Sequence, residues 1–145
     1  MAAQGILAEI GIEMSRFRTH SHFASWAKVC PGNNESAGKR KSASIGQGNR
    51  WLRRFLVQAA RAAARTKDTY LSAQYRRLAA RRGGNRAAIA VAHSILIIIY
   101  YLLQRHCTYA ELGGNYFDER EQEATVRRLS HRLERLGYTV TKRVA

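Results

Sequence analysis

The longest apolar stretch of the chain runs from Ala87 to Leu103 and is interrupted only by His93 and Ser94. A membrane-spanning helix usually needs about 20 apolar residues, whereas this stretch has seventeen and carries an ionisable group near its middle. We therefore predict a fully buried central helix of a globular domain and no membrane span. Within that helix we expect His93 to be a hydrogen-bonded core histidine.

Two segments before this stretch repeat apolar residues with a helical period. At roughly 100° per residue, the helix predicted over residues 50–66 has an apolar side formed by Trp51, Leu52, Phe55, Leu56, Ala59, Ala60 and Ala63. A second helix is expected over residues 68–82, because Asp68 is a capping residue type and Gly83-Gly84 stops a helix.

The C-terminal part predicts one further helix. Asp118 and Glu121 resemble a capping box, and the helix that follows would carry an apolar stripe formed by Val126, Leu129, Leu133 and Leu136. Gly137 ends it, and residues 138–144 allow one short strand. The sequence therefore predicts a mainly α fold, a single helical domain with a buried apolar central helix, a basic loop and room for one short C-terminal strand.

The basic loop lies in the stretch CPGNNESAGKRKS, residues 30–42. Its turn formers, Pro31 to Asn34, argue against helix. Ser36 follows, and then three cations, Lys39, Arg40 and Lys41. A hydroxyl beside three cations fits either a nucleophile near a phosphate or a solvated turn, and from the residues alone the turn is the commoner case.

The charge of the chain indicates an anionic partner. There are 25 Lys and Arg residues against 10 Asp and Glu, for a net charge of +15 and a pI of about 10.9. Residues 36–110 hold fifteen basic groups and one acid, Asp68, which is a local charge of +14. The alternative is that these basic residues only form a solvated face. An excess of basic residues over so long a stretch favours nucleic acid as the partner. We expect the phosphate contacts to come from Lys39, Arg40, Lys41, Asn49, Arg50, Arg53, Arg54, Arg61 and Arg65.

Several other classes of protein are disfavoured. Cys30 and Cys107 form neither a CxxC motif nor a disulfide framework, which fits a reducing cytoplasm, and the histidines lack zinc-site spacing. Gly32 and Gly38-Lys39 approach a Walker A motif, but five residues separate the glycines and Arg40 stands where Ser or Thr should hold magnesium. We predict no metal or cofactor in this chain and no signal peptide.

Three segments, residues 8–42, 48–83 and 90–96, together resemble the C-terminal domain of insertion-sequence transposases of the IS-one-ten type. The most specific parts are Ser36-Ala37-Gly38-Lys39 and the run GNRWLR that begins at Gly48. The resemblance implies that Ser36 is a catalytic serine, and that Mg²⁺ belongs to a separate RuvC-like domain with a DEDD carboxylate set. It also implies DNA and a guide RNA as partners, homo-oligomers of the full-length transposase, and a cytoplasmic, nucleoid-associated location.

The chain departs from that family pattern in several places. Family members usually carry glycine where this chain has Lys28, proline where it has Arg18, and basic residues at Gly46 and Gln47. The chain also opens part-way into a family element, so we expect residues 1–112 to be an N-terminally truncated transposase domain and residues 113–145 a helical extension.

The predicted function is DNA transposition, as the DNA-binding and serine-nucleophile domain of an insertion-sequence transposase. We expect this chain to lack the RuvC-like DEDD domain and to be inactive by itself. The alternative is a basic helical module that binds nucleic acid without catalysis.

Overall fold

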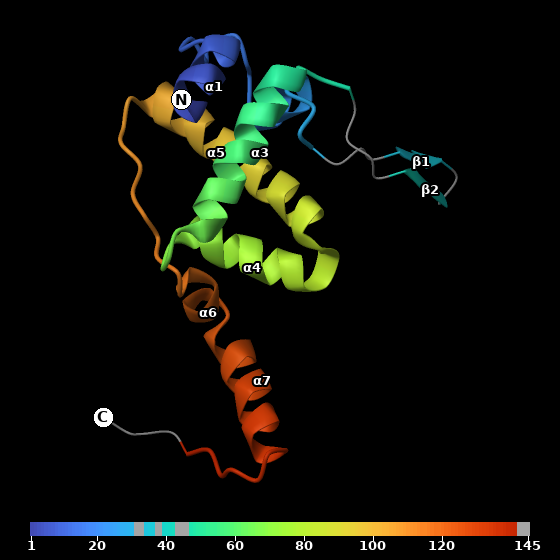
Figure 1. Ribbon diagram of the computed structural model, residues 1–145, viewed down its shortest axis with the longest axis vertical. Helices are drawn as coiled ribbons and strands as arrows, with labels where there is room; N and C mark the ends of the chain where they lie inside the picture. Colours follow the sequence, from blue (N-terminus) through green and yellow to red (C-terminus); the bar gives the residue numbers. More distant parts are fainter. Residues whose placement is uncertain (31–33, 37–38, 43–46, 142–145) are drawn as a thin grey trace.

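The computed structural model describes residues 1–30, 34–36, 39–42 and 47–141, with the backbone alone considered in 34–36 and 39–42 (Figure 1). The described elements are α1 (Ala2–Ile10), α2 (His20–Trp26), β1 (Asn34–Ser36), β2 (Lys39–Ser42), α3 (Arg50–Arg65), α4 (Tyr70–Arg82), α5 (Gly84–Arg105), α6 (Tyr116–Arg120) and α7 (Gln122–Glu134). The predicted mainly α fold is confirmed. The basic loop differs from the prediction, because it contains the antiparallel pair β1 and β2.

Helix α5 is the centre of the core, and it packs against α2, α3 and α4. Its buried side chains are Ala87, Ala88, Val91, Ala92, Leu96 and Tyr100. Val91, Ala92, Leu96 and Tyr100 belong to one buried cluster with residues of α1, α2 and α3, including Ile6, Ile10, Phe23, Leu52, Leu56 and Ala60. The burial of this apolar area is the main source of stability for a helical domain of this size.

The prediction that this helix is fully buried was wrong. By length and composition α5 could cross a membrane, but the core helix of a soluble protein can be equally long and apolar. Of the 18 consecutive residues of α5 that are most apolar, 33% are buried. Between Val91 and Tyr100 the other positions of α5 are half-buried. His93 lies on a half-buried position, where burial, and secondarily His20, lowers its pKa. The expected hydrogen bond of its ring is not found among the described residues.

The caps of α3 and α4 explain where both helices begin. The Asn49 side chain accepts hydrogen bonds from the amides of Trp51 (2.9 Å) and Leu52 (3.1 Å). Helix α4 is capped by Thr69, whose hydroxyl accepts from the amide of Ser72. Asp68, the predicted cap, instead adopts a left-handed conformation with φ 54°. The Asp68 prediction was therefore wrong by one residue.

The C-terminal segment forms two helices where one was predicted. Helix α6 ends at Arg120 and α7 begins at Gln122, so Asp118 and Glu121 form no capping box. The Glu121 carboxylate instead pairs with Arg77 of α4 at 2.6 Å, and the Phe117 ring stacks on that of Tyr70 at 5.2 Å. These contacts hold α6 against α4.

A second contact joins the segment after α5 to the start of α4. Glu111 accepts hydrogen bonds from the amides of Tyr70 (2.7 Å) and Gly113 (2.9 Å) and from the hydroxyl of Tyr109 (3.2 Å). Burial of its carboxyl raises the Glu111 pKa, but these hydrogen bonds outweigh it and leave the pKa lowered. Burial, followed by the charge of Glu111, raises the pKa of Tyr109 to about 12.

Helix α7 extends away from the helical body, as Figure 1 shows. Its predicted apolar stripe is exposed, with exposed fractions of 55% at Val126, 48% at Leu129, 41% at Leu133 and 68% at Leu136. Residues 138–141 form no strand, and the remainder of the strand allowed by the sequence, from residue 142 on, lies outside the described residues.

Candidate nucleic-acid interface

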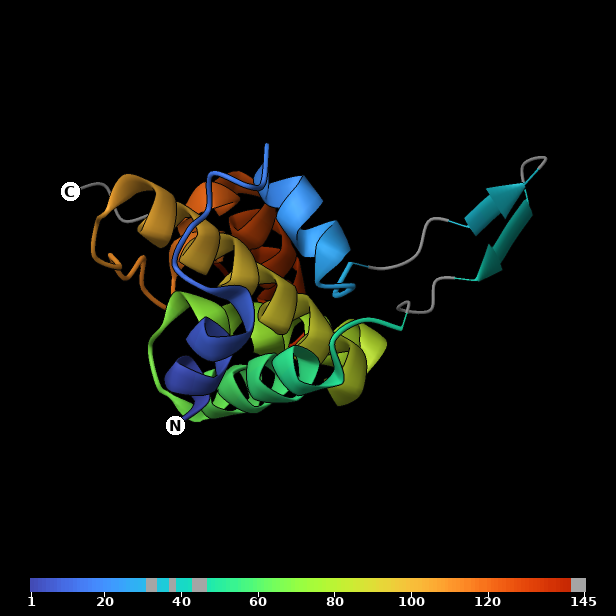
Figure 2. The same ribbon diagram turned by 90° about the horizontal axis from the view of Figure 1, so that it is seen from above.

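Ser36 lies at the end of β1, in a hairpin that stands out from the helical body (Figures 1 and 2). The backbone register places Ser36 opposite Lys39 and Glu35 opposite Arg40. Residues 37–38, which join the strands, lie outside the described residues. The hairpin therefore brings the serine position next to the first of the three predicted cations, and Lys41 follows on the same strand.

The two segments that lead into and out of the hairpin meet at Gly48. A Cβ atom placed on Gly48 would lie 2.5 Å from Cβ of Lys28 and 2.9 Å from the carbonyl oxygen of Ala27. Only glycine fits such a close approach. The contact fixes the end of α2 beside the start of α3, and so fixes where the hairpin leaves the body.

Lys28 occupies a conformation that favours glycine. Its φ is 53°, in the left-handed region that β-carbon-bearing residues rarely adopt. Glycine is also the residue that the family resemblance expects at this position. The structure thus gives a physical reason for that expectation, and Lys28 keeps the turn at a cost in backbone strain.

Helix α3 carries the predicted arginine face. Arg50, Arg54, Arg61 and Arg65 are exposed, Arg53 is half-buried, and the opposite side of the helix is buried at Leu52, Leu56 and Ala60. Arg61 also makes a long hydrogen bond, 3.4 Å, to Asn85. The predicted separation into an apolar and a cationic side is therefore present, and DNA contact by these arginines stays a prediction.

Asn49 has a structural role at this site. Besides capping α3, its side-chain amide donates to the Glu9 carboxylate of α1. This bond ties the start of the arginine helix to α1, while the Gly48 contact ties it to α2. The predicted contact of Asn49 with nucleic acid is untested.

Trp51 is a residue whose exposure the sequence analysis missed. We predicted it on the apolar side of α3, yet it is 50% exposed, with the guanidinium carbons of Arg50 and Arg54 at 5.4 and 6.0 Å from its ring centroid. The sequence carried a signal for this arrangement, because Trp51 directly follows Arg50 and precedes Arg54 by three residues. Trp26, at the end of α2, is likewise exposed, at 44%.

Activation of Ser36 by a metal ion would need carboxylate or imidazole groups that converge on one point. Among the described residues, no three His, Cys, Asp or Glu side chains converge as a metal site would require. The residues that the structure describes therefore do not fit a magnesium centre, and we derive no metal-dependent step for this chain.

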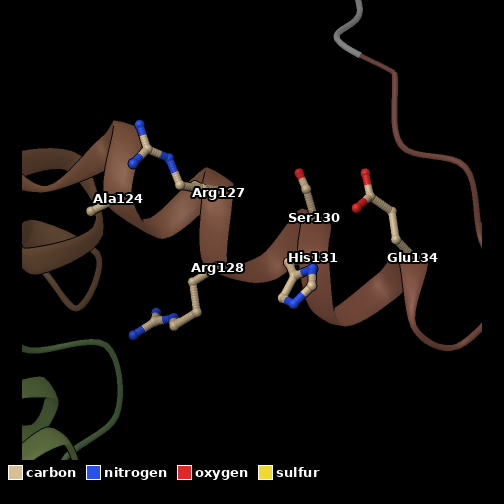
Figure 3. Close-up of a pocket in the computed structure, with 6 residues that line it drawn as sticks. All are labelled: Ala124, Arg127, Arg128, Ser130, His131 and Glu134. Carbon is tan, nitrogen blue, oxygen red and sulfur yellow. The ribbon is translucent and has the colours of Figure 1, made fainter.

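A hollow of about 670 Å³ on α7 offers a different set of chemical groups, Ser130, His131 and Glu134. In Figure 3 the side chains of Ser130 and Glu134 point to one side of the helix, and the His131 ring points away from them. No hydrogen bond joins the three in the described part of the chain. A nucleophile needs its base within hydrogen-bond reach, so this hollow lacks the geometry of a catalytic triad.

The protein is a helical domain with an exposed arginine face and a hairpin of basic sequence. Such a distribution of positive charge is typical of proteins that bind polyanions. The profile of the "Transposase IS116/IS110/IS902 family" matches residues 1–76. The chain belongs to this transposase family.

A curated relative is consistent with that assignment. The "Probable family 20 transposase" of Pseudomonas aeruginosa is 30% identical over 113 residues, which cover 75% of this chain and 33% of the relative. The aligned part is thus a third of the relative's length. No solved structure matches the chain.

Proposed function

We propose that this chain acts in DNA transposition, as the DNA-binding and serine-bearing part of an insertion-sequence transposase. The observation that carries the proposal is the close contact at Gly48, which holds the start of the arginine helix beside the end of α2, between which the Ser36–Lys39 hairpin lies in the chain. The arginine face and the serine hairpin would then act on one nucleic-acid ligand. Family membership supports DNA as the partner and the cytoplasm as the place of action. A guide RNA, oligomers of the full-length protein and the division near residue 112 remain predictions.

In the proposed reaction the Ser36 oxygen attacks a DNA phosphorus and loses its proton, and a sugar oxygen leaves with the electrons of the broken P–O bond and is protonated. The chain's own part is to present the hydroxyl and to neutralise phosphate charge with its cations, because charge must be stabilised where it develops. Deprotonation of Ser36 would fall to groups of a DEDD domain, as the family resemblance implies.

Binding is tested by the dependence of DNA affinity on salt. Each phosphate contact adds about 0.9 to the slope of log affinity against log salt on duplex DNA. Reversing Arg50, Arg54 and Arg61 to Glu should flatten the slope by about 2.7 if each makes one contact. Reversal of three arginines of α7, namely Arg127, Arg128 and Arg132, is the matched control, because it changes the net charge equally and should flatten the slope less. Equal effects from both triplets would mean that the α3 face is only a solvated surface.

Catalysis is tested with purified chain, Mg²⁺, guide RNA and cleavable DNA. The isolated chain should give no product, and addition of a DEDD domain from the family should give a serine-linked DNA species. Ser36→Ala should abolish this species and leave DNA affinity within about twofold, since a single hydroxyl adds little to phosphate binding. A Ser36→Ala chain as active as the parent would instead leave the alternative, a non-catalytic binding module.

A further inference from the structure

The chain has two tryptophans, and both lie exposed beside the base of the hairpin. Trp26 ends α2, next to Ala27, whose carbonyl oxygen approaches Gly48. Trp51 follows Gly48 by three residues, in the first turn of α3. Figure 2 shows the end of α2 and the start of α3 on the side of the body from which the hairpin stands out. The two tryptophans therefore lie on the two segments between which the serine hairpin begins and ends.

Neighbouring side chains hold each ring in place. The Trp26 ring stacks on that of Phe23, with centroids 6.0 Å apart and planes at 12°, and it contacts Phe17 at 5.4 Å. The guanidinium groups of Arg50 and Arg54 lie over the Trp51 ring, and the Asn49 side chain accepts a hydrogen bond from the Trp51 backbone amide. Both rings are thus positioned before any ligand arrives, although about half of each residue's surface remains open to solvent.

Large apolar rings are usually buried, so two of them at one junction suggest a ligand that has flat apolar faces. The charge of +14 over residues 36–110, which includes Arg50 and Arg54 beside Trp51, disfavours a basic or purely apolar partner. Unpaired nucleotides satisfy both conditions, because their phosphates are anionic and their bases stack on aromatic rings and arginine planes. Bases within a duplex are already stacked on one another and do not offer their faces.

We propose that Trp26 and Trp51 stack the bases of single-stranded nucleic acid at the base of the serine hairpin. This inference rests on the proposed function, since it assumes that the basic surface binds nucleic acid. It adds the strand state of the ligand at this site, with unpaired bases on the tryptophans and phosphates on Arg50 and Arg54.

Tryptophan fluorescence gives a direct test, because each single variant leaves one reporter. Trp26→Phe isolates Trp51, Trp51→Phe isolates Trp26, and phenylalanine keeps an aromatic ring in each place. Single-stranded oligothymidylate, single-stranded oligouridylate and a mixed-sequence duplex of equal length are titrated separately. Stacked bases should quench the fluorescence of either remaining tryptophan when a single strand binds, and the duplex should quench it far less. Comparison of oligothymidylate with oligouridylate shows whether DNA, RNA or both occupy the site.

Affinity provides the second readout. Trp51→Ala should weaken single-strand binding by about 5- to 150-fold, the range for loss of one stacked base, and should change duplex binding little. Tyr138→Ala is the matched control, since Tyr138 is 65% exposed on the C-terminal segment and should have no effect. Circular dichroism confirms that each variant is folded.

The outcomes separate this inference from the proposed function. Salt-sensitive binding of the oligonucleotides with unchanged fluorescence, or with equal loss of single-strand and duplex affinity in Trp51→Ala, would overturn the stacking site and leave the basic interface intact. If neither strands nor duplex bind, the proposed function itself fails.

Discussion

A double-mutant cycle at the hairpin junction tests whether Gly48 and Lys28 are in direct contact. In Gly48→Ala, the new Cβ would meet three atoms within 3.0 Å, namely Cβ of Lys28 at 2.5 Å, Cγ of Lys28 at 2.9 Å and the carbonyl oxygen of Ala27 at 2.9 Å. Neither Cβ nor a backbone oxygen is the free end of a flexible side chain, so the backbone must shift. Overpacking of this kind costs about 1–3 kcal/mol of the free energy of unfolding.

Two of the three close atoms belong to Lys28, and Lys28→Gly removes both. The substitution also relieves the left-handed strain at φ 53°, a gain of about 1–2 kcal/mol that the larger chain entropy of unfolded glycine partly offsets. With only the Ala27 oxygen remaining, Gly48→Ala should cost less in the Lys28→Gly background. We expect a coupling free energy of at least about 1 kcal/mol.

Urea unfolding monitored by circular dichroism gives the four free energies of the cycle. Lys28→Ala is the matched control, because it removes the charge and Cγ but keeps the Cβ at 2.5 Å, so Gly48→Ala should remain costly beside it. Effects of Gly48→Ala and Lys28→Gly that add to within about 0.5 kcal/mol would refute the contact and the pinned junction derived from it.

Three further outcomes follow from the packing and the pKa shifts. Leu96→Asp should unfold the domain because Leu96 is fully buried, whereas Ile97→Asp, on a half-buried position of α5, should be tolerated better; equal thermal midpoints would contradict the assignment of the buried face. Because burial lowers the pKa of His93, protonation favours the unfolded chain, and stability should fall as pH drops from about 7 to 5; His93→Gln should reduce that fall in urea midpoints. Glu111→Ala should speed amide exchange at Tyr70, whose amide it accepts at 2.7 Å, and unchanged exchange would argue against the contact.

Sequence periodicity predicted helix α3 well, because one face of that helix is buried. Helix α3 begins and ends within a residue of its expected bounds, because its apolar and arginine sides are distinct and Asn49 caps it. Periodicity failed where tertiary contacts decide the outcome. The break at Glu121 coincides with an ion pair to Arg77 of another helix, and pairing across long sequence distances leaves no local signal.

The candidate site was predicted in part. Charge and family resemblance indicated Ser36 and the arginine face, but the hairpin was expected only as a loop, although a two-residue connection that contains Gly38 is typical of hairpins. The contact between Lys28 and Gly48 joins residues twenty positions apart, so the composition of neither segment reveals it. The exposure of Trp51 was missed because a helical wheel places a residue on a side and says nothing of where the neighbouring helices end.

The position of the core along the chain has a consequence for how the molecule unfolds. All residues of the buried hydrophobic cluster lie between Ile6 and Tyr100, and α7 contacts only α6 among the described helices. A helix of 13 residues without tertiary support is only marginally stable in water. Helix α7 therefore belongs to a separate and weaker unit of local opening, and its amides should exchange with solvent long before those of α3 and α5. A protease that acts on the folded protein should cut there first and leave a fragment that retains the whole core.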